Sequence, residues 1–140
     1  MPNQVTRAIQ DATFSTSASM NVAGATTSTN ALDLGQARAF PVNGDITVVI
    51  STTAATGANN KNVNIALQDS DVNLAANFTN VTVGSLPVVV IIPEVSASYA
   101  ATTVNISAPH NLRQFIRLKE NTETNGGNAS DGTYSLKVLF

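Results

Sequence analysis

The chain of 140 residues has no cysteine, no tryptophan, a single histidine and few charges. The absence of cysteine excludes disulfides, thiolate metal sites and cysteine nucleophiles. His110 has no second histidine or cysteine beside it in the sequence to complete a transition-metal site, so we expect no bound metal or cofactor. Charged residues make up 11% of the chain, less than half of the usual ~25%. So few charges cannot build many exposed helical faces, and the composition therefore favours strands and loops.

The charge balance and the hydropathy also limit the possible partners. The net charge is -2 and the isoelectric point about 5.1, so non-specific binding of nucleic acid through overall charge is not expected. No stretch approaches the ~18 apolar residues of a membrane span, and the first residues lack the apolar core of a signal peptide. We expect neither nucleic acid nor a membrane as a partner, and synthesis in the cytoplasm.

Short alternating segments between turn signals dominate the rest of the chain. They recur at a spacing of roughly ten residues, which is typical of a sandwich, barrel or jelly roll. We predict an all-β, single-domain jelly-roll or β-sandwich of about eight short antiparallel strands. The apolar run between Pro87 and Pro93 is expected to be a strand buried on both faces. The apolar faces predict a core that consists of Ile46, Val48, Ile50, Val63, Ile65, Leu67, Val89, Ile91, Val104, Ile106, Ile116 and Leu118.

The first 29 residues differ from the remainder because Ser, Thr and Ala dominate them. We interpret residues 1–29 as an extended N-terminal arm that precedes a β-domain over residues 30–140. The composition is typical of a disordered segment, and the alternative is an arm held against a partner surface or a second copy of the chain. In that case Phe14, Met20 and Val22 are the expected apolar contacts.

The end of the chain reads as two strands that form a closing hairpin around a polar insert. On the strand from Arg113 to Glu120, alternation places Ile116 and Leu118 on one face. The opposite face then carries Arg113, Phe115, Arg117 and Lys119. This face is either a basic patch that contacts acidic side chains of a partner or a sister subunit, or a solvated face that protects an edge strand from aggregation.

No motif indicates catalysis. The chain has no Gly-x-Ser-x-Gly elbow, no glycine-rich phosphate loop and three glutamates in all. Asp69, Asp71 and Asn73 resemble the start of a calcium loop, but Leu74 and Asn80 stand where such a loop needs Gly and Glu. We therefore interpret this segment as a polar turn that closes the preceding strand, and we do not expect an enzyme.

Three segments resemble the jelly-roll capsid cement, or decoration, proteins of tailed bacteriophages. "NALDLGQAR" (residues 30–38) is similar to an early Leu-Asp-Leu-Gly segment of that family, which follows a Thr/Ala-rich arm. "TVNISAP" followed by "RQFIRLKE" is similar to its strand-Pro-loop-strand segment, and a glycine-rich loop and a Leu/Val-rich last strand complete the likeness. The resemblance covers nearly the whole chain. Phe115 stands where the family commonly has Tyr, and "SASYAATT" looks like an insertion.

The resemblance implies a structural protein of the virion without enzyme activity. It would bind the major capsid protein on the outer surface of the capsid lattice and stabilise the head, as a homotrimer in preference to a dimer. Two alternatives stay open. One is a glycan- or receptor-binding β-domain of a phage tail or a bacterial surface structure, which would be expected to show an aromatic platform that this sequence barely offers. The other is an enzyme.

Overall fold

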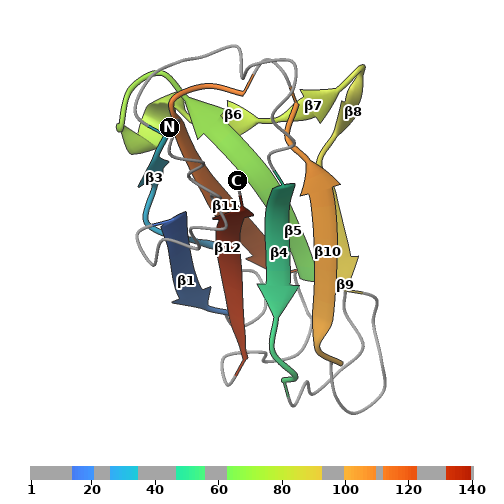
Figure 1. The fold of residues 1–140 in the computed structure, drawn as a ribbon. Helices are drawn as coiled ribbons and strands as arrows, with labels where there is room; N and C mark the ends of the chain where they lie inside the picture. Colours follow the sequence, from blue (N-terminus) through green and yellow to red (C-terminus); the bar gives the residue numbers. More distant parts are fainter. Residues whose placement is uncertain are drawn as a thin grey trace, which may run out of the picture.

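The computed structural model describes residues 14–20, 26–34, 47–55, 63–92, 100–109, 112–122 and 132–139. Within these ranges the chain forms twelve β-strands and one turn of 3-10 helix, η2 (Ala75–Asn77), and it contains no α-helix (Figure 1). Every strand pairing is antiparallel. The predicted all-β class is confirmed.

Four strands form the sheet nearer the viewer in Figure 1, which we call the front sheet. Their order across the sheet is β1, β12, β4, β10. Alternation of Val and Ile with Ser and Thr along these strands suits one buried and one solvated face. The strands are β1 (Ser15–Ser19), β12 (Thr133–Leu139), β4 (Thr47–Thr52) and β10 (Thr102–Ser107).

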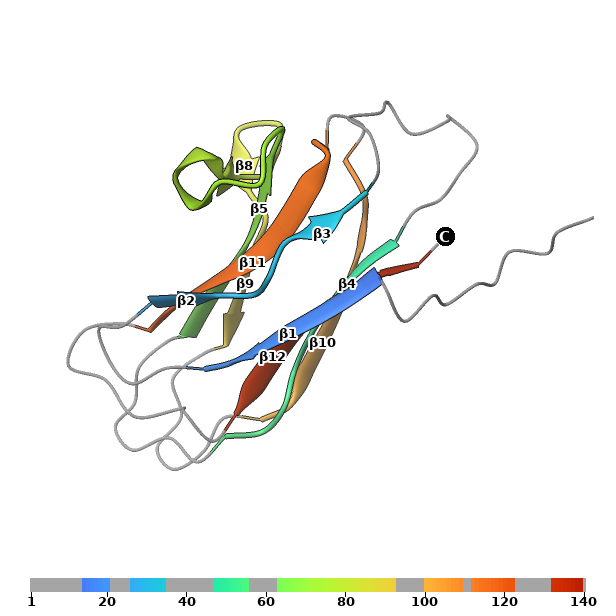
Figure 2. The ribbon, with the colours of Figure 1, turned by 90° about the vertical axis from the view of Figure 1, so that its left-hand side faces the viewer.

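The second sheet, which we call the back sheet, packs behind the first, and Figure 2 shows the two layers from the side. Its order is β2, β11, β5, β6, with β3 also paired to β11 and β9 also paired to β5. A separate ribbon of two short strands, β7 (Thr82–Val83) and β8 (Leu86–Pro87), extends from this sheet. The remaining strands are β2 (Thr26–Ser28), β3 (Leu32–Asp33), β5 (Val63–Ser70), β6 (Thr79–Asn80), β9 (Val89–Ile92) and β11 (Phe115–Thr122).

The strand order is that of a jelly roll. β2 and β3 pair with successive parts of β11, and β6 and β9 pair with successive parts of β5, so each couple counts as one interrupted strand. Eight strands then remain in chain order, arranged 1-8-3-6 in the front sheet and 2-7-4-5 in the back sheet. The first pairs with the eighth, the second with the seventh, the third with the sixth and the fourth with the fifth, as in a hairpin wound into two packed sheets.

The core lies between the two sheets and contains most of the predicted residues. Those on β4, β5 and β11 are at most 1% exposed, and Val104 and Ile106 on β10 are partly buried against them. Val89 is also partly buried, but it is not among the residues packed against the core, to which its neighbour Val90 belongs. The expected burial of this strand on both faces is not seen at its start, where Val90 is buried and Val89, on the opposite face, is only partly buried. Ile46 and the side chain of Ile91 lie outside the described part.

The expectation of an N-terminal arm apart from the β-domain is wrong for residues 14–20 and 26–29. β1 pairs with β12 along its whole length, and β2 pairs with β11. Met20 is 1% exposed within the core, and its backbone N–H donates to the carbonyl of Gly132 over 2.9 Å. Small Ser, Thr and Ala side chains suit a strand at a sheet edge, and composition alone did not separate this from disorder. Residues 1–13 lie outside the described part.

The expected closing hairpin is also wrong. β11 belongs to the back sheet and β12 to the front sheet, so the two last strands face each other across the core instead of pairing. Tight hairpins use connections of two to five residues, whereas the residues from Glu123 to Gly132 separate these strands. A connection of that length allows the chain to cross from one sheet to the other.

Candidate interaction surface

The segment between β5 and β9, residues 71–88, forms the feature that we call the projection, in which only the short strand β6 still pairs with β5. The residues on either side of the β7–β8 ribbon are bonded to the backbone of Leu67, which accepts from the Val81 N–H over 2.9 Å and donates to the Val88 carbonyl over 3.0 Å. Val88 also donates to the carbonyl of Val81 over 2.8 Å. The six residues of the β7–β8 ribbon are therefore inserted into the strand that pairs with β5. Figure 1 shows the ribbon extending away from both sheets, and Figure 2 shows η2 on the outer side of the back sheet.

A tight turn ends the ribbon at Gly84 and Ser85. Val83 and Leu86 are directly paired across it, which leaves a loop of two residues. Gly84 has φ of 65°, as the first position of such a turn requires, and a side chain there is strained in that conformation. Val83 and Leu86 are therefore the outermost paired residues of the ribbon, directly beside its turn.

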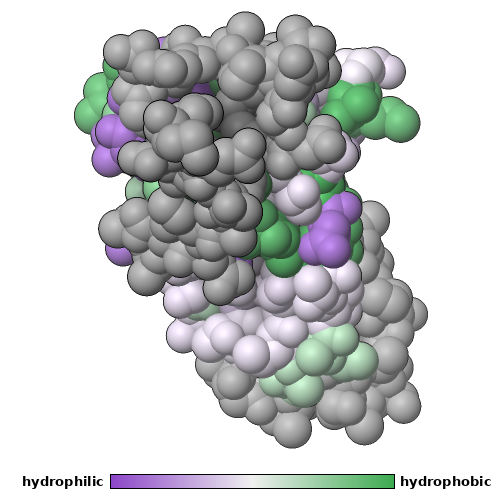
Figure 3. Space-filling view, viewed as in Figure 1, coloured by the Kyte–Doolittle hydropathy of each residue, from purple (hydrophilic) through white to green (hydrophobic). Residues whose placement is uncertain are grey.

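Aliphatic side chains point into solvent from this projection. Leu86 is 72% exposed, Leu74 61%, Val83 58% and Val72 42%. They are the exposed large hydrophobic residues of the described part, and all four lie within fifteen consecutive positions. The ribbon is among the green regions of Figure 3. They lie in two places, with Val83 and Leu86 on the β7–β8 ribbon and Val72 and Leu74 just before η2, which Figure 1 shows apart from the ribbon. Single exposed apolar residues are ordinary, whereas two exposed aliphatic pairs within one short segment are candidate contact points.

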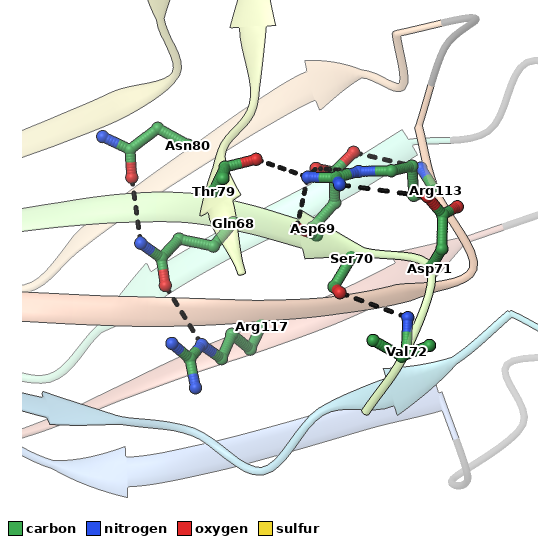
Figure 4. Close-up of polar contacts among 9 residues, drawn as sticks. All are labelled: Gln68, Asp69, Ser70, Asp71, Val72, Thr79, Asn80, Arg113 and Arg117. Atoms are coloured by element: carbon green, nitrogen blue, oxygen red, sulfur yellow. Dashed lines mark hydrogen bonds and ion pairs between the residues drawn. The ribbon is translucent and has the colours of Figure 1, made fainter. Parts of the chain in front are cut away.

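Arg113 fastens the beginning of the projection to the sandwich (Figure 4). Its Nε and Nη2 donate to Asp69 Oδ1 over 2.9 and 2.6 Å, and its backbone N–H donates to Oδ2 over 3.0 Å. Nη2 also donates to the Asp69 carbonyl and to the Thr79 hydroxyl. The side chain of Asp69 is 9% exposed, so these donors take the place of most of the water around its carboxyl group. Arg113 therefore joins the end of β5 to the start of β6.

Arg117 holds the middle of the projection through a second set of contacts. Its guanidinium carbon lies 4.1 Å from the centre of the Phe78 ring, a geometry that favours the cation. Nε donates to Gln68 Oε1 over 3.0 Å, and Nη2 donates to the Ala75 carbonyl over 3.2 Å. Gln68 in turn donates to Asn80 Oδ1 over 3.0 Å (Figure 4). Burial lowers the pKa of Arg117, yet a guanidinium stays charged at neutral pH.

The predicted face of β11 exists, but its arginines are engaged within the chain. Phe115, Arg117 and Lys119 lie on the outer side, opposite the buried Ile116 and Leu118. Arg113, which precedes β11, is bound by Asp69 and is therefore not an unpaired cation offered to a partner.

The expected apolar contacts of the arm also lie elsewhere. Phe14 packs partly against the core, and Met20 belongs to it. Val22 lies outside the described part. The four exposed aliphatic residues of the projection were not predicted. The signal that could have found them is a Val and a Leu directly flanking a Gly-Ser turn.

The turn after β5 is a polar turn, as expected, and Asp69, which binds Arg113, lies on β5 just before it. The Val72 N–H donates to Ser70 Oγ over 3.2 Å, which closes the turn. In the described ranges, no group of three or more His, Cys, Asp or Glu side chains is placed to hold a metal ion. Over the same ranges, no helix has the length and apolar character needed to cross a membrane.

A buried polar cluster joins the two sheets at the opposite end of β11. Glu120 and Tyr134 are both fully buried, on β11 and β12 respectively. The Thr27 hydroxyl donates to Glu120 Oε2 over 3.1 Å and shares a 2.9 Å hydrogen bond with the Tyr134 hydroxyl. Burial raises the pKa of Tyr134, and the nearby Glu120 raises it further. The cluster attaches β2 to both layers of the sandwich.

No protein-family model matches the chain, and no curated protein matches it closely. The function is therefore inferred from the fold, from the projection and from the resemblance in the sequence.

Proposed function

We propose that this protein is a phage capsid decoration protein that binds the outer surface of the major capsid protein lattice and stabilises the head. The observation that carries the proposal is the projection, which is fastened by two arginines and presents four aliphatic side chains to solvent. A jelly roll with such an attachment element suits a role in binding and not in catalysis. The resemblance in the sequence supplies the capsid as the partner.

The apolar surface that the projection exposes is small, which suits attachment through many copies. A buried aliphatic side chain contributes about 1.5–3 kcal/mol, which corresponds to roughly 100 Å² of apolar surface each. The exposed residues form two pairs, and each pair thus offers on the order of 200 Å², about a quarter of the ~800 Å² that each partner buries in a standard stable interface. Single contacts of this size are weak. A capsid lattice presents many equivalent sites. Once one subunit of an oligomer has bound, the next subunit binds in an intramolecular step, so weak single contacts are sufficient.

The tight anchoring of the projection supports attachment through it. A side chain that is already held in position loses little conformational entropy when a partner covers it. Arg113 and Arg117 limit the movement of Thr79 and Phe78, so the loop that carries the aliphatic residues is positioned before binding. The partner surface that fits it is an apolar groove, such as those at the joints between capsomers.

A co-sedimentation experiment tests this proposal. Heads of the phage that encodes the chain, prepared without this protein, would be mixed with the wild type and with the double variant Leu74→Ser and Leu86→Ser. We expect binding to weaken at least tenfold, because two buried aliphatic contacts are lost. The matched control is Val49→Ser, which removes a partly exposed aliphatic side chain from the front sheet and should bind as the wild type does.

Thermal unfolding of the same variants separates attachment from folding. Both leucines are more than half exposed, so the melting temperature of the double variant should match that of the wild type. Unaltered binding of the double variant to heads would overturn the role of the projection. Failure of the wild-type protein to bind heads would overturn the proposed function itself.

A further inference from the structure

We propose that the open edge of β10 pairs with the same edge of a second copy of the chain, so that two front sheets join across a twofold axis. The inference does not rest on capsid binding, because the occupant of the edge is the chain itself, and it gives a dimer in place of the homotrimer that the resemblance implies. The partner that a sheet edge binds best is another extended strand, because such a strand satisfies the unpaired N–H and C=O groups of the edge.

The backbone of β10 shows which of its groups are open. Among the described strands, β10 is the last of the front sheet and pairs with β4 alone. The Thr102 N–H points toward β4, where it donates to Thr52 Oγ1 over 3.1 Å. Because these groups alternate along a strand, those of Thr103, Asn105 and Ser107 point away from β4. No backbone bond in the described part of the chain satisfies them there.

The edges of the two sheets are not equally protected against pairing. At one edge of the back sheet β2 and β3 have three and two residues, and at the other β6 has two and β9 four. Short strands and prolines, such as Pro87 just before β9, hinder pairing with other chains. β10 has six residues without a charge, a proline or a glycine. The other front edge, β1, also lacks these protections, but Ala18 is its one apolar residue, whereas β10 carries Val104 and Ile106.

A twofold axis that passes through the Asn105 pair brings β10 and the β10 of the second copy together as antiparallel neighbours. Asn105 then lies opposite Asn105 of the second copy, and Thr103 lies opposite Ser107, so small polar side chains meet on the outer face. On the inner face Val104 lies opposite Ile106, and each is now only partly buried. No charges oppose each other. The register forms three hydrogen-bonded pairs, and each such pair exchanges two N–H···O bonds.

Charge substitution at Asn105 tests this pairing in trans. Sedimentation of the wild-type chain should show a concentration-dependent dimer. Asn105→Lys and Asn105→Asp should each shift dissociation to at least tenfold higher concentration, because like charges meet at the axis. An equimolar mixture of the two variants should restore a dimer. Since Asn105 is exposed, each variant alone should keep the wild-type circular dichroism and, at a concentration low enough for the wild type to be monomeric, its melting temperature.

Single cysteines test the register, because the native chain contains none. Directly opposite residues of a hydrogen-bonded pair have Cα atoms about 5.5 Å apart, which lies within the range that a disulfide bridges. Mild oxidation should therefore convert Asn105→Cys into a covalent dimer and leave Thr103→Cys, the matched control on the same face, monomeric under denaturing conditions. A wild-type chain that sediments as a monomer or as a trimer would overturn the proposal. So would a mixture of the Lys and Asp variants that stays monomeric, or equal cross-linking at both positions.

Discussion

In the back sheet, polar side chains bind other parts of the same chain, whereas in the front sheet they form a surface of short hydroxyl groups. Arg113 and Arg117 together reach the end of β5, the start of β6 and η2. On the front sheet a single row crosses all four strands. It consists of Ser17, Ser135, Ser51 and Thr103.

The difference shows where each sheet uses its polar groups. A long cation that is bound within the chain stabilises a loop, and in this protein the loop presents apolar side chains. Short hydroxyls on a flat face make weak bonds with their neighbours, such as the 3.2 Å contact of Ser51 with Thr103, and they leave room for close approach of another surface. The back sheet is therefore expected to be sensitive to single substitutions, and the front face to be tolerant of them.

The largest effect on the unfolding free energy is expected for the ion pair between Arg113 and Asp69. Asp69→Ala leaves Arg113 without its carboxylate partner, and breaking a largely buried ion pair of this kind costs about 3 kcal/mol of unfolding free energy. Urea denaturation measures the loss. Asp71→Ala is the matched control, because this carboxylate is 64% exposed and lies 4.0 Å from Arg113, and exposed pairs contribute only about 0–1 kcal/mol. Equal losses of unfolding free energy in both variants would contradict a stabilising role of the ion pair between Arg113 and Asp69.

The next effect is expected at the polar cluster between the sheets. Tyr134→Phe removes the hydroxyl that is hydrogen-bonded to Thr27, and we expect a loss of about 1–2 kcal/mol. The pKa of Tyr134 is raised in the folded state, so folding favours the protonated phenol. Stability is then fully present below the unfolded pKa of about 10 and decreases as the pH rises above it.

Tyr134→Phe should lack this alkaline decrease. The unfolding free energy of both proteins is measured between neutral and alkaline pH. The value for the variant is subtracted from that for the wild type at each pH, so that the contribution of lysine titration, which both proteins share, cancels. A difference that stays constant through pH 10 would show that the phenol does not titrate differently in the folded chain.

A smaller effect is expected at Arg117. Arg117→Lys keeps the charge but loses the planar contact with Phe78 and the Nε bond to Gln68. Cation–π pairs at partly exposed sites contribute about 0.5–1 kcal/mol, and the loss of unfolding free energy should lie in this range. Hydrogen exchange of the amides in residues 75–81 should increase at the same time. Unchanged exchange there would mean that Arg117 does not restrain the projection.

The smallest effect is expected on the front face. Ser51→Ala removes one hydroxyl from the row that crosses the sheet, and surface changes of this kind usually lie within about 0.5 kcal/mol. Thermal unfolding at a low protein concentration measures the monomer alone. A loss as large as that of Asp69→Ala would remove the contrast between the two sheets.

The sequence by itself determined the all-β class and most of the core, because both depend on local alternation. A strand exposes successive side chains to opposite faces, so Ile65 and Leu67 or Ile116 and Leu118 must share one face wherever their strand lies. The same alternation placed Phe115, Arg117 and Lys119 together. Where the alternation is missing, as in the apolar run of β9, the sequence did not show that Val90 faces the core and Val89 does not.

The tertiary structure alone decided which strands pair and which side chains are covered. Met20 is buried because β1 pairs with β12, and Arg113 is bound because the end of β5 brings Asp69 to it. Exposure of Leu86 is decided in the same way, since its ribbon extends beyond both sheets, where no described side chain covers it. Pairing and coverage depend on residues far apart in the chain, and a local pattern carries no information about them.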